Sequence, residues 1–305
     1  LPKSLIAQEP SIKRSDARLL VYDRKKDTII HAQFKDIGNF LPQNVKFFRN
    51  YVSVLKARLF GKRRTGGSVE CVLLNPTEDA NTWWCLIKPG KKTFNAGYFF
   101  DEEHYEAKIL DSNSVGEYKV HFKLFRKKNV YELANKLGKM PLPPYIKREN
   151  EDIRDKLDAE RYQTVYADRN KPFAAAAPTA GLHFTNELIE RLKADGHHFY
   201  DLTLNVGIGT FQPIQVDLIE NHKIHSESFE IQPETIKALN HEGNQLRVAV
   251  GTTSVRAIES LYAQLAKTPD ALKTFFDKTY TATTDLYIYP PAKFHGIDAM
   301  ITNFH

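Results

Sequence analysis

The sequence predicts an α/β main domain, with a mixed sheet and flanking helices, that is discontinuous in sequence and carries an inserted small β-barrel domain. Short β-type runs follow one another in the middle of the chain, and strands alternate with helices after residue 173. Between the two patterns lies the proline-rich passage 140–146. We therefore expect the main domain at residues 1–55 and 146–305 and the inserted domain at residues 56–145.

The first part of the main domain is predicted to begin with a β-hairpin. Residues 17–22 and 28–34 are rich in apolar residues and flank the polar turn 25–27. Residues 34–41 then have the pattern of a short helix that ends before Pro42.

The inserted domain is predicted from evenly spaced short strands with polar turns, which are typical of a small barrel or a sandwich. These runs are residues 52–60, 69–74, 83–87, 105–110 and 118–124. A helix is expected at residues 131–137, before the prolines. Residues 150–160 are highly charged and are expected to be exposed or mobile, whereas residues 161–166 resume an ordered segment.

Charge divides the chain into two halves. Residues 1–150 contain 28 Lys and Arg against 16 Asp and Glu, whereas residues 151–305 contain 15 against 21. A basic half beside a mildly acidic half suggests a polyanionic partner such as RNA, although solvated surface charge is the alternative. The basic clusters of the inserted domain are Lys62, Arg63 and Arg64, then Lys91 and Lys92, then Arg126, Lys127 and Lys128. Aromatic residues interleave with them and could stack bases, but we expect most of these aromatics in the barrel core.

The second part of the main domain alternates strands and helices. Strands are predicted at 198–204, 246–250, 286–289 and 299–302, and helices after Thr185 and at 255–265. Ligands of such sheets bind beyond the carboxyl ends of the strands. We therefore expect the glycine and hydroxyl turns that follow these strands to lie together at one edge.

The stretch 178–185 is the first candidate for chemistry. Thr179, Gly181 and His183 stand between alanines and a predicted helix, and Gly181 allows either hand of backbone turn. Small residues let a ligand come close, and an imidazole can transfer a proton near neutral pH. The alternative is a Pro-Gly loop with a surface histidine.

Two glycine turns are further candidates. Gly207-x-Gly209 lacks the third glycine of a dinucleotide-binding motif, because Gln212 stands there, so we do not predict NAD binding. The turn 251–254 follows a strand and opens a helix, so its hydroxyls could hold a carboxylate or a ribose oxygen, with Arg256 nearby. A plain helix cap explains this turn equally well.

The string His222-x-x-His225-Ser226-Glu227 allows two kinds of chemistry. Two imidazoles and a carboxylate could bind a metal, but the spacing fits no standard zinc pattern and a third ligand such as His183 or His305 would be required. Alternatively, Glu227 orients His225 for proton transfer. Solvated histidines remain a third interpretation.

The composition excludes several classes of protein. No apolar run approaches 18 residues and no signal sequence is visible, so we expect a cytoplasmic protein without membrane contact. Only two cysteines, Cys71 and Cys85, are present, which excludes a disulfide framework and a cysteine-rich zinc site. No coiled-coil or exposed apolar stripe is evident, so a monomer is expected. The chain starts without methionine and stops after an apolar run, and we expect further residues at both ends.

Several strings together resemble the S-adenosylmethionine:tRNA ribosyltransferase-isomerase family of queuosine biosynthesis. The resemblance covers essentially the whole chain. The matching strings, in order, are residues 1–8, 140–145, 161–166, 176–185, 206–211, 222–227, 251–256 and 301–305.

The resemblance implies a reaction and its partners. In this family the ribosyl part of S-adenosylmethionine moves onto the aminomethyl group of 7-aminomethyl-7-deazaguanine at the tRNA wobble position, which yields epoxyqueuosine, adenine and methionine. S-adenosylmethionine is a co-substrate, so no metal or other cofactor is expected. Proton transfer is assigned to His183, His225 with Glu227, and His305. Substrate contacts are expected from Thr179, Gly181, Gly207, Gly209, Thr210, Thr252, Thr253, Ser254, Arg256 and Asn303. The basic clusters would bind the tRNA anticodon arm.

Three departures from the family pattern affect these expectations. Residues 50–53 read Asn-Tyr-Val-Ser where a polar, basic run is usual. Asn205 and Gln212 stand where His and Arg are more usual. The family also continues beyond Asn-Phe-His with an apolar helix.

Two functions of other classes remain as alternatives. The first is a non-catalytic RNA-binding protein that works through the basic barrel. The second is a metal-dependent hydrolase that uses His222 and His225, which predicts sensitivity to chelators.

Overall fold

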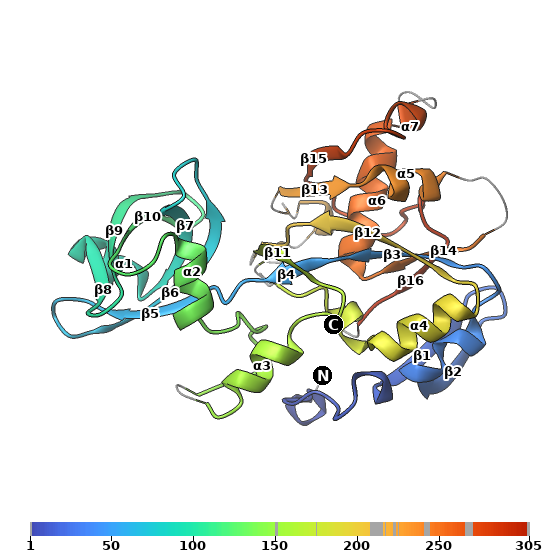
Figure 1. Cartoon of the computed structure of the whole chain (residues 1–305), viewed down its shortest axis with the longest axis horizontal. Coiled ribbons are helices and arrows are strands. Elements are labelled where there is room, and N and C mark those ends of the chain that lie inside the picture. Colours follow the sequence, from blue (N-terminus) through green and yellow to red (C-terminus); the bar gives the residue numbers. More distant parts are fainter. Residues whose placement is uncertain are drawn as a thin grey trace. The chain divides into compact units, whose positions relative to one another are not determined.

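The computed structural model describes residues 2–149, 152–174, 176–207, 216, 218–221, 224, 226–240, 245–265 and 271–303. The chain divides into two compact units. The first contains residues 1–52, 163–169 and 177–305, and the second contains residues 53–162 and 170–176. The fold is therefore an α/β main domain, discontinuous in sequence, with an inserted small β-barrel, as the fold class predicts (Figure 1).

The main unit contains a mixed six-stranded sheet in the order β15-β13-β12-β3-β14-β16. Neighbours β12, β3, β14 and β16 are parallel, whereas β13 and β15 are antiparallel additions at one side. The strands are β3 (Lys46–Asn50), β12 (His198–Leu204), β13 (Glu227–Ile231), β14 (Arg247–Val250), β15 (Tyr280–Thr284) and β16 (Ala299–Ile301).

Helices cover both faces of this sheet because alternate strand residues are apolar on both sides. Phe47, Val248 and Val250 join a core with helix α4 (Asn186–Ala194) and the 3₁₀ helix η3 (Phe34–Phe40). Phe48 and Ala249, fully buried, point to the opposite face, which faces α5 (Pro233–Leu239) and α6 (Thr252–Leu265). The side chain of Thr185 caps α4 by accepting a hydrogen bond from the backbone N–H of Leu188 at 3.1 Å, as its position predicts.

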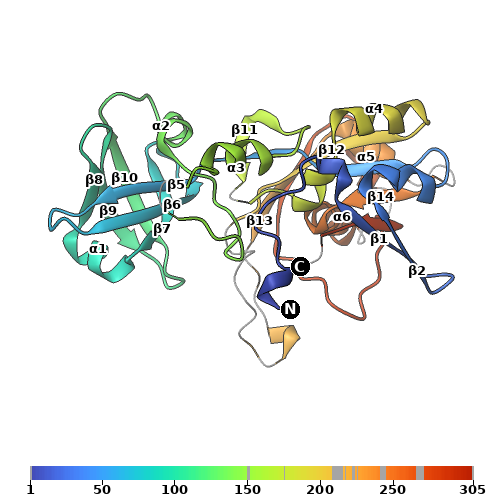
Figure 2. The ribbon, with the colours of Figure 1, turned by 90° about the horizontal axis from the view of Figure 1, so that it is seen from below.

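The hairpin β1 (Arg18–Asp23) and β2 (Thr28–Gln33) forms a separate antiparallel pair, and Figure 2 shows it extending from the main unit. Its paired residues include Tyr22 opposite Ile29, both more than half exposed. The remaining short elements of this part of the chain are η1 (Lys3–Leu5), η2 (Arg14–Asp16), η4 (Thr179–His183), η6 (Ile219–Asn221) and α7 (Ala271–Thr274). The strands β4 (Val52–Val54) and β11 (Asp168–Ala174) form a two-stranded sheet.

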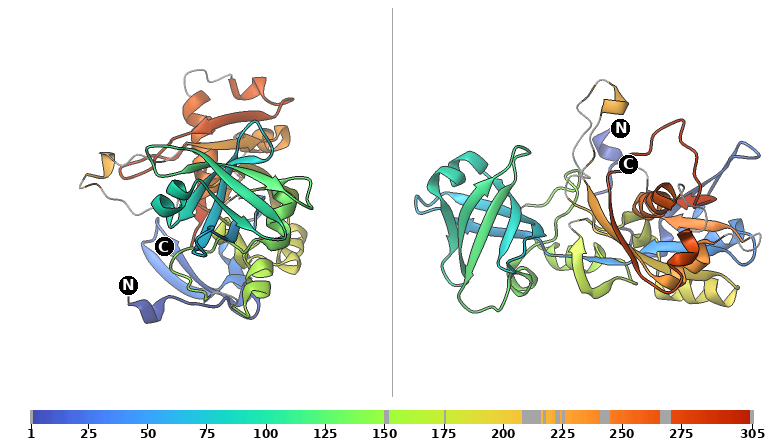
Figure 3. Two further views of the ribbon diagram at one scale, coloured as in Figure 1. Left: turned by 90° about the vertical axis from the view of Figure 1, so that its left-hand side faces the viewer. Right: turned by 90° about the horizontal axis from the view of Figure 1, so that it is seen from above.

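The second unit is a closed six-stranded barrel in the order β10-β7-β6-β5-β8-β9, which Figure 3 shows from two sides. This finding decides between the barrel and the sandwich. Cys71, Cys85, Trp83, Phe99 and Phe122 lie in its core, with both thiols free. The elements are β5 (Arg58–Lys62), β6 (Ser68–Pro76), β7 (Thr82–Lys88), α1 (Gly90–Ala96), β8 (Tyr98–Asp101), β9 (Tyr105–Ser112), β10 (Tyr118–Leu124), α2 (Val130–Leu137) and α3 (Asp155–Arg161).

Two predictions of local structure are wrong. Residues 286–289 do not form a strand, because β13 begins at Glu227 and already pairs that residue with Thr284, so the chain beyond Thr284 has no partner strand. The charged segment 150–160 contains most of α3, and Asp158 within it is buried rather than exposed. The charges there are paired: Arg148 and Asp158 form an ion pair whose side chains are only 5% and 7% exposed.

Candidate functional site

The carboxyl ends of the parallel strands bring most of the described candidate residues to one edge of the main sheet. β12, β14 and β16 run in the same direction as β3 and end at Leu204, Val250 and Ile301. The turns that follow carry Gly207, residues 251–254 and Asn303. Gly207, residues 251–254 and Asn303 therefore follow strand ends at one edge, whereas Gly209 and Thr210 lie outside the described residues and residues 286–289 form no strand.

His183 ends the turn η4 and lies at this edge with Asn303. Its Nε2 is 2.7 Å from Oδ1 of Asn303, which follows β16. The ring of Phe34 lies 5.4 Å from the imidazole, and Phe184, 1% exposed, anchors the turn in the core. Burial lowers the pKa of His183, and the hydrogen bond to Oδ1 of Asn303 only partly opposes this effect. The imidazole is therefore neutral at pH 7.

The bond to Asn303 also selects the tautomer of His183. An amide oxygen only accepts, so Nε2 carries the proton and Nδ1 carries the lone pair of the neutral ring. The site thus presents a neutral imidazole with one basic nitrogen, which is what a general base requires.

Gly181 lets the turn of His183 come close to two neighbouring side chains. A Cβ at this position would overlap the hydroxyl of Tyr166 and would lie 2.9 Å from Cγ2 of Thr164. The backbone N–H of Gly181 donates to the carbonyl of Pro178 at 2.8 Å, which closes the turn. Thr179 is half-buried at the start of the same turn.

Glu227 and Arg256 form a buried ion pair at the same edge of the sheet. Nη1 of Arg256 lies 2.5 Å from Oε2 of Glu227, and the two side chains are 11% and 7% exposed. Oε1 of Glu227 accepts the backbone N–H of Gly207 at 3.0 Å, and Nη2 of Arg256 donates to the carbonyl of Thr284 at 2.9 Å. The pair therefore ties the turn after β12 to α6 and to the end of β15.

The hydroxyls of the turn before α6 differ in their surroundings. Thr252 is exposed, and the hydroxyl oxygen of Thr253 is buried without a hydrogen-bond partner among the described residues. The hydroxyl of Ser254 is fully buried and donates to the carbonyl of Val250 at 2.8 Å, so it is engaged by the end of β14. Gly251 has a φ of 90°, which glycine adopts without strain. Of these hydroxyls, that of Ser254 is closed to a ligand.

Four expected site residues lie outside the described residues: Gly209, Thr210, His225 and His305. His222 and Gln212 also lie outside them. Within the described ranges, no three His, Cys, Asp or Glu side chains lie close enough together to hold a metal ion. No helix of the described chain is long and apolar enough to cross a membrane.

Asn50, which opens the segment 50–53, and the departure Asn205 have structural roles. The side chain of Asn50 bridges β3 and β12, since its amide nitrogen donates to the carbonyl of Leu204 at 2.9 Å and its oxygen accepts the N–H of Leu204 at 3.2 Å. Asn205 donates to the hydroxyl of Ser228 at 2.8 Å. Both amides hold the carboxyl edge of the sheet together.

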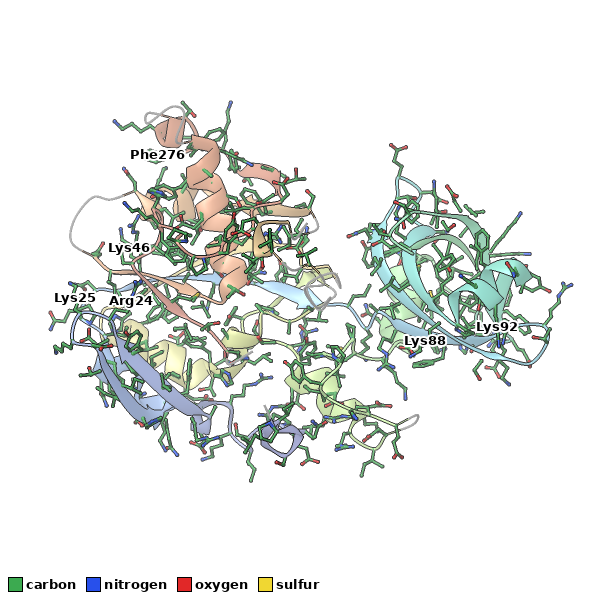
Figure 4. The ribbon with its side chains drawn as sticks, turned by 180° about the vertical axis from the view of Figure 1, so that it is seen from behind. Arg24, Lys25, Lys46, Lys88, Lys92 and Phe276 are labelled. Carbon is green, nitrogen blue, oxygen red and sulfur yellow. The ribbon has the colours of Figure 1, made fainter. Side chains whose placement is uncertain are left out.

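The basic clusters of the barrel lie at two different ends of it. The strand register places Lys62 opposite Ser68 and Lys88 opposite Glu70, so the turn with Arg63 and Arg64 and the helix with Lys91 and Lys92 share one end. Figure 4 labels Lys88 and Lys92 at this end. Leu124 pairs with Tyr105 at the other end, where Arg126, Lys127 and Lys128 follow.

A separate cavity of about 740 Å³ runs beside α6. It is lined by residues 286–289 and 291–295 and by α6 residues from Glu259 to Leu265. His183, Glu227 and Arg256 do not line it. The chemical groups at the sheet edge, rather than this cavity, define the candidate site.

Comparison with known proteins identifies the family. The model of the family described as queuosine biosynthesis protein matches residues 1–305. A relative from Natranaerobius thermophilus, named S-adenosylmethionine:tRNA ribosyltransferase-isomerase, is 42% identical over 310 residues, which cover 100% of this chain and 84% of the relative. The chain belongs to this family. A relative with the same name from Thermotoga petrophila is 41% identical over 308 residues, which cover 100% of this chain and 84% of the relative.

A solved structure also covers the chain. The crystal structure of an S-adenosylmethionine tRNA ribosyltransferase from Thermotoga maritima is 30% identical, with a TM-score of 0.48, and the match covers 100% of this chain and 83% of that one.

The ribosyltransferase-isomerase family is a family of enzymes, so the enzyme prediction is confirmed.

Two residues that contact the turn of His183 are not among the site residues expected from the sequence. Tyr166 abuts Gly181, and Arg14 donates to the carbonyl of Leu182 at 3.0 Å. Tyr166 ends one of the strings that carry the family resemblance, which is a signal that could have found it. Arg14 stands in a segment without a motif, and only the folded chain brings it to the turn.

Proposed function

We propose that this chain transfers and isomerises the ribosyl part of S-adenosylmethionine onto 7-aminomethyl-7-deazaguanine at the wobble position of tRNA. The products are epoxyqueuosine in tRNA, adenine and methionine. The observation that carries this proposal is the 42% identity to a relative of that name over the whole chain. The partners are S-adenosylmethionine and the tRNA, no further cofactor or metal takes part, and the protein acts as a monomer in the cytoplasm.

The reaction requires a base, because the sulfonium of S-adenosylmethionine acidifies the carbon beside it and that proton must be removed. His183 supports this role: its imidazole is neutral at pH 7, and its Nδ1 carries the lone pair. The departing adenine requires a proton in turn. We assign this acid step to one of the other two histidines of the family strings, His225 with Glu227, or His305.

The buried pair Glu227–Arg256 supports a positioning role as well. Its hydrogen bonds fix the N–H of Gly207, after β12, and the carbonyl of Thr284, at the end of β15. The backbone therefore keeps one geometry at these two points of the sheet edge. A fixed geometry favours the aligned approach of the substrate groups. We propose that the turns at 207–210 and 251–254 hold the methionyl and adenosyl parts, with Thr253 as the hydroxyl that turns toward the substrate.

The barrel supplies positive charge for the tRNA. Charge reversal at Lys91 and Lys92 should weaken tRNA binding and reduce the dependence of log K on log salt by roughly one unit per lost phosphate contact. The same change at Lys127 and Lys128 tests the opposite end. A cluster whose reversal leaves both quantities unchanged does not bind tRNA.

The test of the reaction is release of adenine from S-adenosylmethionine by the metal-free protein, with and without tRNA that carries the aminomethyl-deazaguanine base. The proposal expects release only with that tRNA. The variant His183→Gln should retain tRNA binding and lose turnover by roughly 100-fold or more, the size of a general-base contribution. The matched control is His198→Gln, an exposed histidine at the start of β12.

Two results would contradict the proposal. A folded protein that binds the tRNA but never releases adenine would support the non-catalytic RNA-binding function. Adenine release that needs a divalent ion and stops with a chelator would contradict the metal-free mechanism.

Because burial lowers the pKa of His183, the acid limb of the pH profile for wild-type turnover should lie below about 6.5, the ordinary histidine value.

A further inference from the structure

The turn that carries His183 is held by a segment near the start of the chain. Nη1 of Arg14, in η2, donates to the carbonyl of Leu182 at 3.0 Å. The same segment positions Phe34, whose backbone N–H donates to the carbonyl of Ala17 at 2.8 Å. The ring of Phe34 in turn lies against the imidazole of His183. Residues 14–17 therefore act on the turn through its backbone and, through Phe34, on the ring.

Arg14 also brings a positive charge to a buried imidazole. Burial is the main cause that lowers the pKa of His183, the bond to Asn303 raises it, and the charge of Arg14 lowers it further. The other charged groups on η2 and η3 are Asp16, Lys35 and Asp36, and Asp16 and Lys35 lie 3.6 Å apart as an ion pair. Of the charged groups on η2 and η3, Arg14 is the one whose charge lowers the pKa of the His183 imidazole.

We propose that Arg14 is a positioning residue for His183: it fixes the turn by holding the carbonyl of Leu182 and keeps a positive charge beside the imidazole, so that the ring enters the reaction as a neutral base. This inference rests on the proposed role of His183 as the base. It adds a residue from the opening segment to a site otherwise built from the carboxyl edge of the sheet. Tyr166 supports the same turn from the side of Gly181.

The test compares Arg14→Gln, Arg14→Lys and the control Arg18→Gln, an exposed arginine four residues further along at the start of β1. The first readout is the NMR titration of the His183 ring protons in the full chain without substrate, assigned with His183→Gln. The second is the pH profile of adenine release. Thermal unfolding of each variant shows whether it is folded.

Arg14→Gln should move the titration of His183 and the acid limb of the profile upward, because the charge of Arg14 lowers the pKa of this imidazole. Turnover on the plateau should fall by roughly tenfold or more, because a displaced turn misaligns the base. Arg14→Lys keeps the charge, so the titration and the limb should stay near the wild-type pH while the plateau falls. Arg18→Gln should change neither.

A titration of His183 that stays at the wild-type pH in a folded Arg14→Gln protein would overturn the proposal. So would an equal shift in Arg14→Lys, because geometry rather than charge would then set the ionisation. The two proposals fail separately. If the wild-type protein releases no adenine, the proposed function fails, and the titration still decides whether Arg14 acts on His183.

Discussion

The buried pair Glu227–Arg256 makes a quantitative prediction for stability. Glu227→Ala would leave the guanidinium of Arg256, whose side chain is 11% exposed, without its carboxylate partner. It would also remove the acceptor of the Gly207 N–H. Breaking a buried pair from one side costs about 3–5 kcal/mol. At about 2–4 °C per kcal/mol for a folded unit of this size, Tm should fall by roughly 6–20 °C.

The assay is thermal unfolding of three variants in the same buffer. Glu227→Gln keeps one oxygen acceptor and should lose about 1–3 kcal/mol, less than the alanine variant. The control is Glu190→Ala, because Glu190 forms a surface pair with Lys193 at 2.9 Å and is 71% exposed. Such a pair contributes at most about 1 kcal/mol.

Replacing both partners separates stability from function. Glu227→Met with Arg256→Met removes both charges and should recover most of the lost Tm, since apolar side chains of similar volume often replace a buried pair without cost. Adenine release should remain low, because nothing then holds the turns in place. The reasoning is refuted if Glu227→Ala unfolds within about one degree of Glu190→Ala.

Three further predictions concern other parts of the chain. Gly181→Ala should lower turnover and Tm, because the added Cβ overlaps the Tyr166 hydroxyl. Adding Tyr166→Phe should restore only part of both, since the Cβ still lies 2.9 Å from Cγ2 of Thr164. No rescue in the double variant would contradict this geometry. Ser254→Ala should leave the KM for S-adenosylmethionine within about twofold of wild type, since the Ser254 hydroxyl is hydrogen-bonded to the carbonyl of Val250. A large rise in KM would show that the hydroxyl reaches the substrate. Asp158→Ala should destabilise the second unit by about 3–5 kcal/mol, because Arg148 would stay buried without its partner; unchanged urea unfolding would refute this.

The sequence predicts most of the fold because its periodicities are local. The hairpin, the α4 cap and the barrel strands all follow from patterns within about ten residues. The sequence does not predict the central strand β3, since Lys46 and Arg49 interrupt its apolar run and the segment resembles the adjoining barrel strands. The sequence does not predict the helix α3 for a different reason: its charged residues have the pattern of a solvated segment, and only the folded chain pairs Arg148 with Asp158.

The candidate site is predictable only where motifs lie on turns. The family strings point to His183 and Asn303, which are 120 residues apart, but no local pattern reveals that Nε2 meets Oδ1. Arg14 and Leu182 are 168 residues apart. Such pairs depend on the strand order of the sheet, and this order is a tertiary property.

The position of β3 in the sheet has a consequence for synthesis on the ribosome. β3 precedes the barrel in sequence, yet both its neighbours, β12 and β14, follow it. At about 5–20 residues per second, roughly ten to thirty seconds pass between the emergence of β3 and that of β12. The barrel strands end at Leu124, so the barrel can close within that interval. During this interval Phe47 and Phe48, which are fully buried in the folded protein, have no sheet to pack in. Their exposed apolar side chains can then bind a chaperone that recognises apolar segments of nascent chains.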